Sequence, residues 1–446
     1  MPFVHKKDFA VYKERRDTLI TAIKEAHPKN SNGIVVLFGG FEQDGYAFKQ
    51  ERSFYYLTGI EEPATALTLD LASGVSTLYV PNMGKERAKW VAITLEPTEE
   101  NAQYYGVDAI VYLGNPCKGY QCHPFFSASE YEVLLLLLQK AVAQSRTIFT
   151  FNPSSAYGYV EQRFIVQRIG NLVPGLQELL HDISPLVAHM RRKKNNHEIE
   201  LLYKAIDSTI HAHEVAARTI KEGKIEYEIQ AIIEYMFTSS GCSLAFPSIV
   251  ASGKNSTVLH YNLNNKILAS GDLIVIDIGA EYNYYCADIT RTYPVSGEFT
   301  KRQRELYDIV LDTQEYIESI AKPGMWLSNK EKSDQSLNHL AQEFLRSKSY
   351  DKYFPHGIGH FLGLDVHDVG DYNQPLALGD VITIEPGIYI PAEGNGIRIE
   401  DDYWLVKDGV VSLSENLPKH PDDIEKMVNA QEEDSQDYTD DEDAQA

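Results

Sequence analysis

Residues 273–278 are Leu-Ile-Val-Ile-Asp-Ile, an apolar run typical of a buried strand but interrupted by the carboxylate of Asp277. Burying a charge is costly unless that charge is paired or binds a metal ion. If the chain turns back at Tyr282-Asn283, Asp277 lies directly opposite Asp288, with the two Cβ atoms roughly 4.5–5.5 Å apart. Like charges at that separation repel each other, and a multivalent cation between them removes the repulsion. This stretch therefore predicts a metal-binding strand pair.

A second pair of carboxylates follows the same logic further along the chain. Glu385 ends the apolar run 381–384, and Glu400 lies in a second run at residues 396–402. A hairpin whose loop is formed by residues 391–395 brings the two glutamates together. Arg398 points to the same face as Glu400, because strand side chains alternate. It serves either as a structural counter-charge or as a residue that orients a ligating carboxylate, and the two roles are compatible.

Histidines gather between the two predicted hairpins. His356, His360 and His367 lie among glycines within residues 355–368, a spacing that does not fit one face of a helix. A lone histidine is more often structural, but a cluster accompanied by four strand carboxylates favours a functional site. His260, within residues 258–261, is a further candidate, although alone it is better explained as a core or surface residue.

Four carboxylates and one imidazole suit Mn²⁺, Co²⁺, Zn²⁺ or Fe²⁺ rather than a metal that prefers thiolates. Four acidic ligands are enough to hold two ions about 3.5–4 Å apart. Such a pair polarises a carbonyl group and supplies a nucleophile at neutral pH. Amide hydrolysis is the natural use of this chemistry, and phosphoester hydrolysis is the chemical alternative.

Composition excludes several other classes of function. The formal charge of −23 over 446 residues argues against nucleic-acid binding, which relies on basic patches. The longest apolar run, residues 133–138, is too short to cross a membrane. Of the four cysteines, Cys117 and Cys122 beside His123 offer a weak metal clip, but ordinary thiols explain them better. We expect a cytoplasmic protein.

The pattern of apolar runs predicts two domains and a tail. Residues 1–180 are expected to form an α/β domain, with strands at 33–38, 54–57, 76–80 and 147–150 and a helix at 129–142. Residues 181–430 are expected to begin with helices and continue with paired strands, among them 284–290. A helix should begin after Asn195 or Asn196, and a capping box should open another at residues 300–303. The basic residues 191–194 are interpreted as a solvated linker, and the acidic residues 431–446 as a disordered tail.

At these residues the sequence resembles the pita-bread metallopeptidases, and within them aminopeptidase P and prolidase. The resemblance rests on residues 277–282 with 287–292, 356–368, 384–387 and 397–400, and on 54–59 in the first domain. It implies a creatinase-like α/β N-terminal domain followed by an α+β pita-bread catalytic domain. The metal ligands that it implies are Asp277, Asp288, His360, Glu385 and Glu400.

The resemblance also implies roles for the other site residues. His367 and His260 would stabilise the tetrahedral intermediate and the leaving group. A separate mechanistic hypothesis is that Glu385 shuttles a proton. His356 and Arg398 would support the site. Residues 287–311 are more similar to bacterial-type aminopeptidase P than to prolidase.

The function expected from this resemblance is hydrolysis of the bond between an N-terminal residue and a following proline. Two divalent ions would be needed, with Mn²⁺ as the first expectation, and the protein would form a homodimer or homotetramer. The alternatives are a prolidase restricted to Xaa-Pro dipeptides and a pita-bread binding protein that has lost catalysis. Proteins of the latter kind usually lack metal ligands, whereas all five are present here.

Overall fold

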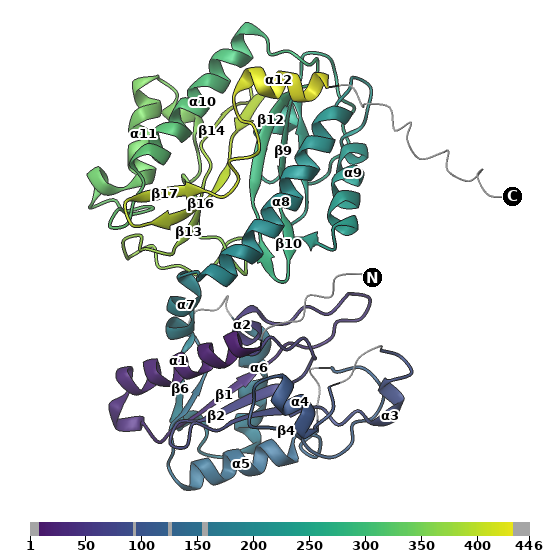
Figure 1. Cartoon of the computed structure of the whole chain (residues 1–446), viewed down its shortest axis with the longest axis vertical. Helices are drawn as coiled ribbons and strands as arrows, with labels where there is room; N and C mark the ends of the chain where they lie inside the picture. The colour runs from purple at the N-terminus through teal and green to yellow at the C-terminus, as the bar shows by residue number, and fades with distance from the viewer. Residues whose placement is uncertain (1–8, 92–94, 124–126, 154–158, 431–446) are drawn as a thin grey trace, which may run out of the picture. The chain divides into compact units, whose positions relative to one another are not determined.

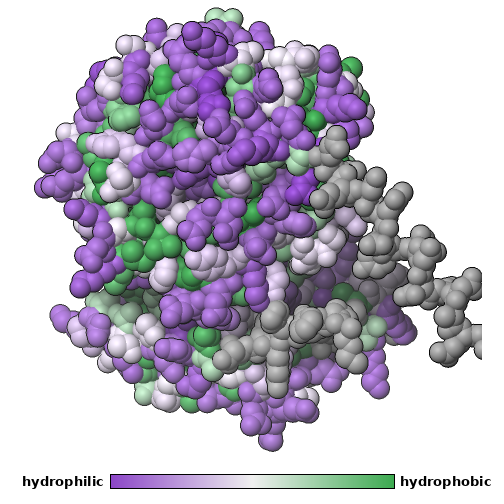
Figure 2. All heavy atoms as spheres, turned by 45° about the horizontal axis from the view of Figure 1, so that its top comes forward, coloured by the Kyte–Doolittle hydropathy of each residue, from purple (hydrophilic) through white to green (hydrophobic). Residues whose placement is uncertain are grey.

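The computed structural model describes residues 9–91, 95–123, 127–153 and 159–430. The chain divides into two compact units, one up to Arg191 and one from Arg192 onward. The division lies inside helix α7 (Ser184–Arg192), eleven residues beyond the boundary that the sequence suggested. The acidic tail predicted for residues 431–446 lies outside the described residues. On the face shown in Figure 2, hydrophilic side chains predominate, with apolar ones scattered among them.

The described residues of the N-terminal unit form one mixed sheet of six strands in the order β4-β3-β2-β1-β5-β6. Its centre is antiparallel, and the outer pairs β3–β4, β1–β5 and β5–β6 are parallel. This arrangement confirms the expected α/β class and three of the four predicted strands. The strands are β1 (Ile34–Phe38), β2 (Ala66–Asp70), β3 (Ser76–Val80), β4 (Ala109–Tyr112), β5 (Ile148–Thr150) and β6 (Leu180–Asp182). The helices before α7 are α1 (Ala10–Ala26), α2 (Arg52–Thr58), α3 (Gly84–Arg87), α4 (Glu99–Tyr104), α5 (Glu132–Ala143) and α6 (Val160–Leu172).

The strand predicted at residues 54–57 is wrong, because these residues form helix α2. The side chain of Glu51 caps the helix by accepting a hydrogen bond from the Phe54 amide. At the other end, Gly59 adopts the left-handed conformation (φ 65°) and its N–H bonds to the carbonyl of Tyr55. A capped helix end satisfies backbone groups that would otherwise stay unpaired. These local bonds, with burial of the aromatic rings, override the β-propensity of the sequence.

The C-terminal unit begins with helices and continues with paired strands, as the sequence predicts. Asn195 caps α8 with Glu198 as its capping-box partner, and Thr300 with Gln303 opens α10. Figure 1 shows the strands between α8 and α9 on one side and α10 and α11 on the other. The helices are α8 (Asn196–Thr219), α9 (Glu226–Ser239), α10 (Lys301–Ile320), α11 (Leu337–Ser347) and α12 (Pro421–Asn429).

Within residues 192–430, four small antiparallel sheets make up the strand layer, in the orders β11-β10-β7, β12-β9-β8, β13-β16-β17 and β14-β15. The first two contain β7 (Ser243–Leu244), β8 (Ile249–Ser252), β9 (Leu273–Ile278), β10 (Ala280–Tyr282), β11 (Tyr285–Cys286) and β12 (Ile289–Pro294). The other two contain β13 (Val381–Ile384), β14 (Gly387–Ile390), β15 (Asn395–Arg398), β16 (Asp401–Val406) and β17 (Gly409–Ser412).

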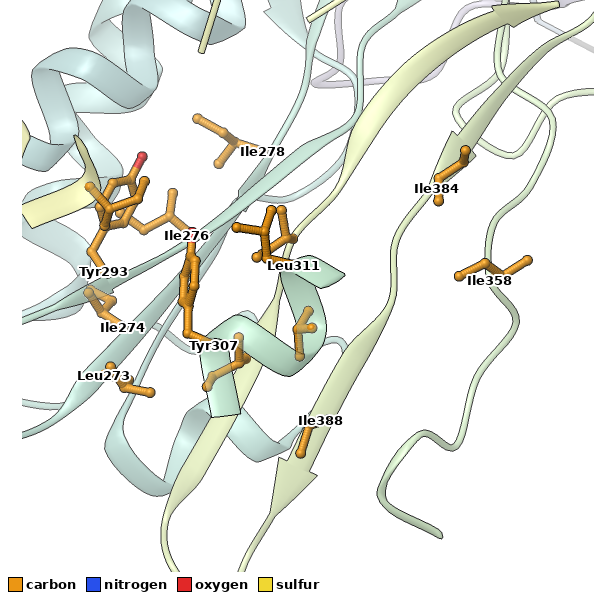
Figure 3. Packing of buried hydrophobic residues seen from close by; sticks show 14 of the residues in the cluster. Leu273, Ile274, Ile276, Ile278, Tyr293, Tyr307, Leu311, Ile358, Ile384 and Ile388 are labelled. Atoms are coloured by element: carbon orange, nitrogen blue, oxygen red, sulfur yellow. The ribbon is translucent and has the colours of Figure 1, made fainter. Parts of the chain in front are cut away.

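The core of the C-terminal unit fills the space between these strands and the helices. Ile274, Ile276 and Ile278 of β9 pack in one cluster with Tyr307 of α10 and Ile384 of β13, as Figure 3 shows. All of them are almost completely buried. The apolar side chains of the strands therefore fix the sheets against the helices and leave the strand ends free to carry polar groups. Among the described residues, no helix is both long and apolar enough to cross a membrane.

Of the basic residues 191–194, which the sequence suggested to be a solvated linker, only Lys193 is exposed and the other three are buried. Arg192 forms a two-pronged ion pair with Asp380, with N–O distances of 2.9 and 2.6 Å. Lys194 donates to Asp368 over 2.8 Å, and both of these side chains are 1% exposed. The acidic partners lie more than 170 residues away along the chain, so the sequence around position 191 gives no indication of them.

We expect Asp380→Ala to lower the free energy of unfolding by about 3–5 kcal/mol, because it leaves the Arg192 guanidinium buried without its partner. Urea unfolding of the purified protein measures this change. Asp312→Ala is the matched control, since Asp312 faces Lys348 in an exposed pair 3.6 Å apart. That variant should change stability by less than about 0.5 kcal/mol. Equal losses in the two variants would contradict the assignment of the Arg192 pair as a buried one.

Candidate metal centre

The first predicted hairpin exists, but its register differs from the expected one. Asp277 of β9 pairs with Thr290 of β12, and Asp288 lies two residues before that position. The turn consists of Asn283 and Tyr284, both with positive φ (46° and 73°), and is centred one residue later than predicted. Two residues of this kind form a type I′ turn, which matches the twist of the strands. A shift of two residues preserves the face of each side chain, so Asp277 and Asp288 are diagonal neighbours on one face.

The second predicted hairpin is confirmed in its register. Gly387 pairs with Arg398 at one side of a short break, and Ile384 pairs with Asp401 at the other. Both ladders share one register, which places Glu385 opposite Glu400 between them. At this break Glu385 and Glu400 belong to neither ladder of strand pairing, which leaves room for their side chains.

Backbone and side-chain hydrogen bonds join the two hairpins at Thr290 and Glu400. The Glu400 amide donates to the Thr290 carbonyl over 3.1 Å, and the Thr290 amide donates to the Glu400 carbonyl over 3.4 Å. The Thr290 hydroxyl also donates to Oε2 of Glu400 over 2.6 Å. The carboxylates of both hairpins are therefore held by one continuous hydrogen-bonded framework.

His360 enters this framework on an extended segment that runs beside β13. Its carbonyl accepts from the Thr383 amide over 2.9 Å, and its amide donates to the Thr383 hydroxyl over 3.1 Å. The ring nitrogen Nδ1 lies 3.0 Å from the Phe361 carbonyl, which places the ring proton on Nδ1. Nε2 is then free to bind a metal ion. It lies 3.3 Å from Asp288, 3.5 Å from Glu385 and 4.0 Å from Glu400.

The charges at this site fit a divalent cation. Burial, and after it the charges of neighbouring carboxylates, raises the pKa values of Asp288 and Glu400 well above their ordinary range. Oδ1 of Asp277 is buried and has no hydrogen-bond partner among the described residues, whereas Oδ2 accepts from Arg398 over 2.6 Å. Asp288, His360 and Glu400 each offer a ligand atom, and these atoms lie within 4.8 Å of one another. A bound cation would pair the orphaned oxygen and neutralise the mutual repulsion.

Arg398 connects the carboxylates to His356 through a residue that the sequence did not single out. The guanidinium donates to the Tyr389 hydroxyl oxygen over 2.9 Å, and that hydroxyl lies 2.9 Å from Nε2 of His356. Burial, and after it the charge of Arg398, lowers the pKa of His356 to about 4. His356 is therefore neutral at physiological pH. Tyr389 could have been found only by noticing that, on β14, it is four residues beyond Glu385 and on the same strand face.

The two remaining histidines lie at the edge of the site. The ring centroid of His367 is 4.4 Å from that of His360, with the planes at 74°. Burial, and after it the nearby His360, lowers the pKa of His367. His260 is exposed and reaches the same cavity from the loop after β8.

One cavity of about 470 Å³ brings all of these groups together. The nine residues predicted from the sequence all line it: Asp277, Asp288, His360, Glu385, Glu400, His260, His356, His367 and Arg398. Sequence reasoning missed its apolar wall, formed by Phe246, Pro247, Ile249, Leu259 and Val366. Four of these residues lie in loops and Ile249 begins β8, so they form no common periodic pattern, and only the folded chain reveals that they share a surface.

Known proteins share both the fold and the extent of this chain. The family model described as Metallopeptidase family M24 matches residues 200–407, and the one described as Aminopeptidase P, N-terminal domain, matches residues 12–116. A Xaa-Pro aminopeptidase of Haemophilus influenzae is 31% identical over 434 residues, which cover 89% of this chain and 94% of that protein. The chain belongs to the aminopeptidase P and prolidase family of M24 metallopeptidases.

Solved structures of this family agree with the membership. Proline aminopeptidase P II from Yersinia pestis superposes with a TM-score of 0.79 at 28% identity, covering 95% of this chain and all of that one. Aminopeptidase P from Escherichia coli with the inhibitor Pro-Leu gives 0.79 at 27% identity, with 95% and 98% covered. Membership confirms the pita-bread fold of the C-terminal unit, and it makes the chain a metallo-aminopeptidase.

We expect Gly359→Ala to weaken metal binding by roughly 10- to 100-fold, the usual cost of disturbing the groups behind a ligand. A Cβ at Gly359 would lie 2.0 Å from the Thr383 carbonyl oxygen and would push the His360 segment away from β13. Titration calorimetry with Mn²⁺ measures the affinity. Gly357→Ala is the control, because its Cβ would meet nothing closer than 3.8 Å. Unchanged affinity in Gly359→Ala would show that His360 does not depend on this pairing.

Proposed function

We propose that this metallo-aminopeptidase hydrolyses the bond between an N-terminal residue and a following proline, using two divalent ions, with Mn²⁺ as the first candidate. The observation that carries the proposal is the convergence of nine polar site residues on one cavity. Relatives called Xaa-Pro aminopeptidase that extend over both units of the chain support the choice of substrate. Co²⁺, Zn²⁺ and Fe²⁺ are the alternative ions.

Asp277, Asp288, His360, Glu385 and Glu400 are the residues that would hold the ions. When bound, such ions polarise a carbonyl group and lower the pKa of water so that it becomes a nucleophile at neutral pH. Arg398 keeps Asp277 in place through a bond of 2.6 Å, and Thr290 does the same for Glu400. The site is thus assembled before substrate arrives.

Glu385 is the proposed general base and acid. Burial raises the pKa of its carboxyl group, which moves it toward the range in which a carboxylate can both accept and return a proton. It would take a proton from the attacking water and pass it to the departing nitrogen of proline. His367 and His260, at the edge of the cavity, would donate hydrogen bonds to the developing oxyanion and the leaving group.

The choice of proline follows from the chemistry of the scissile amide. A proline in second position supplies a tertiary amide without N–H and with a fixed φ. A cavity with an apolar wall selects such a rigid ring by shape, and no amide donor of the substrate is left unpaired. We place the free amino group of the substrate beside Asp277, so that only the first residue is released.

We expect the enzyme to cleave Arg-Pro-Pro after its first residue as well as Xaa-Pro dipeptides. The resemblance of residues 287–311 to aminopeptidase P favours this outcome over a strict prolidase. Chromatography of the products from a panel of di-, tri- and longer peptides with added Mn²⁺ measures it. Turnover of dipeptides alone would assign the enzyme as a prolidase, and a purified protein with no bound or activating metal would favour a binding protein.

Asp288→Asn should abolish peptidase activity while the protein remains folded, because the amide cannot replace the carboxylate at the centre of the cluster. Activity on a Xaa-Pro tripeptide, circular dichroism and metal content measure the three parts of this expectation. Asp408→Asn is the control, since Asp408 is an exposed residue between β16 and β17. Full turnover by Asp288→Asn with metal bound would refute the role of this ligand.

Location and assembly remain predictions. The four cysteines are free, which supports a reducing compartment such as the cytoplasm. The homodimer or homotetramer expected from the family resemblance is testable by light scattering.

A further inference from the structure

The loop that carries His260 lies between β8 and β9 and has little regular structure of its own. Residues 253–257 form one 3₁₀ turn, and the chain then continues without a strand or helix as far as β9, apart from one bridge at Ile267. Leu259, His260 and Asn262 from this loop line the metal cavity. An irregular segment keeps a catalytic side chain in position only if other bonds fix its backbone.

Glu226, the first residue of α9, supplies such bonds. Its side chain is fully buried and accepts five hydrogen bonds, all from the segment 252–266. Oε1 accepts from the amide and hydroxyl of Ser252 (2.7 and 2.8 Å) and from Asn255 (3.2 Å). Oε2 accepts from the Tyr261 hydroxyl (2.8 Å) and the Lys266 amide (2.9 Å). One carboxylate therefore ties the start, the middle and the end of the loop to α9.

The bond to Tyr261 matters most for the cavity, because Tyr261 is the direct neighbour of His260. Its ring is buried and its hydroxyl also lies 3.3 Å from Oδ1 of Asn265 within the loop. His260 lines the cavity, whereas the hydroxyl of Tyr261 bonds to Glu226. The two neighbouring side chains therefore contact different parts of the unit. Fixing Tyr261 fixes the peptide unit from which His260 projects.

Asn264 reinforces the same attachment from a second direction. Its side chain accepts from the Val250 amide of β8 (3.1 Å) and donates to Gln230 of α9 (2.9 Å). The residue adopts a left-handed conformation with φ 46°, which asparagine tolerates better than most residues. The loop is thus attached to α9 by the buried carboxylate of Glu226 and by a partly buried contact with Gln230.

We propose that Glu226 is a positioning residue for catalysis, which holds His260 at the metal cavity through the hydroxyl of Tyr261. The inference rests on the proposed function, in which His260 assists the leaving group. Glu226 itself does not line the cavity and touches no candidate metal ligand. A carboxylate is required because Oε1 faces the Ser252 amide and Oε2 faces the Lys266 amide, and a backbone N–H can only donate.

The test is a double-mutant cycle on a Xaa-Pro tripeptide with saturating Mn²⁺. Glu226→Gln keeps the size of the side chain but turns one acceptor into a donor. We expect kcat to fall by about tenfold or more with KM unchanged, because misplacing a catalytic group by a fraction of an ångström weakens transition-state contacts. In the His260→Ala background the same substitution should cost less than about twofold, since the group that it positions is already absent.

Glu228→Gln is the matched control. Glu228 lies in the same first helical turn and accepts from the Ile225 amide (2.7 Å), but it is exposed and has no bond to the loop. Its kcat should stay within about twofold of that of the parent, well short of the loss expected for a misplaced catalytic group. If Glu226→Gln fails to fold, Tyr261→Phe, which deletes only the hydroxyl, takes its place in the cycle.

The outcomes separate this inference from the function on which it rests. An equal loss of kcat in both backgrounds would mean that Glu226 only stabilises the fold and would overturn the inference. A kcat for Glu226→Gln equal to that of Glu228→Gln would overturn it as well. Absence of Xaa-Pro turnover in the unsubstituted enzyme would instead refute the proposed function.

Discussion

Repulsion among buried carboxylates is the constraint on which the C-terminal unit depends. Asp277, Asp288, Glu385 and Glu400 all face one cavity, and burial together with mutual repulsion raises the pKa values of Asp288 and Glu400. A folded chain tolerates such a cluster only if cations neutralise it or protons bind to it. The same feature that makes the site costly to fold makes it a strong ligand for divalent metal ions.

The strands around this cluster supply the rigidity that catalysis needs. Three of the candidate ligands, Asp288, Glu385 and Glu400, lie immediately outside regular strands. Asp277 is the second-last residue of β9, and His360 lies on the extended segment beside β13. Thr290 and Thr383 contribute hydroxyl groups as well as backbone bonds, so the two hairpins and the His360 segment form one framework. The apolar core shown in Figure 3 keeps this framework in place against the helices. Loops add apolar parts of the cavity wall, among them Leu259.

Much of the candidate site could be predicted, because a carboxylate in an apolar strand is costly to bury unless it is paired or binds a metal ion. The predicted carboxylates and histidines line one cavity, and the register of Glu385 and Glu400 is as expected. The pairing of Asp277 was misjudged by two residues, because two consecutive positive-φ residues, one of them Tyr284, are not evident from residue type. The α/β class of the first unit and the order of helices and strands in the second followed from the pattern of apolar runs, whereas the pita-bread fold followed from the family resemblance. Helix α2 did not, because its caps outweigh its aromatic composition.

The sequence by itself determined which residues are candidates for the chemistry, since ligand type, strand pattern and the order of the motifs are local properties of the chain. Only the tertiary structure decided how those residues are supported. The buried pair of Arg192 with Asp380, the link from Arg398 through Tyr389 to His356, and the attachment of the His260 loop to Glu226 all join distant segments. Such contacts form between segments that become neighbours only after the chain has folded. No local pattern of residues along the chain therefore predicts them.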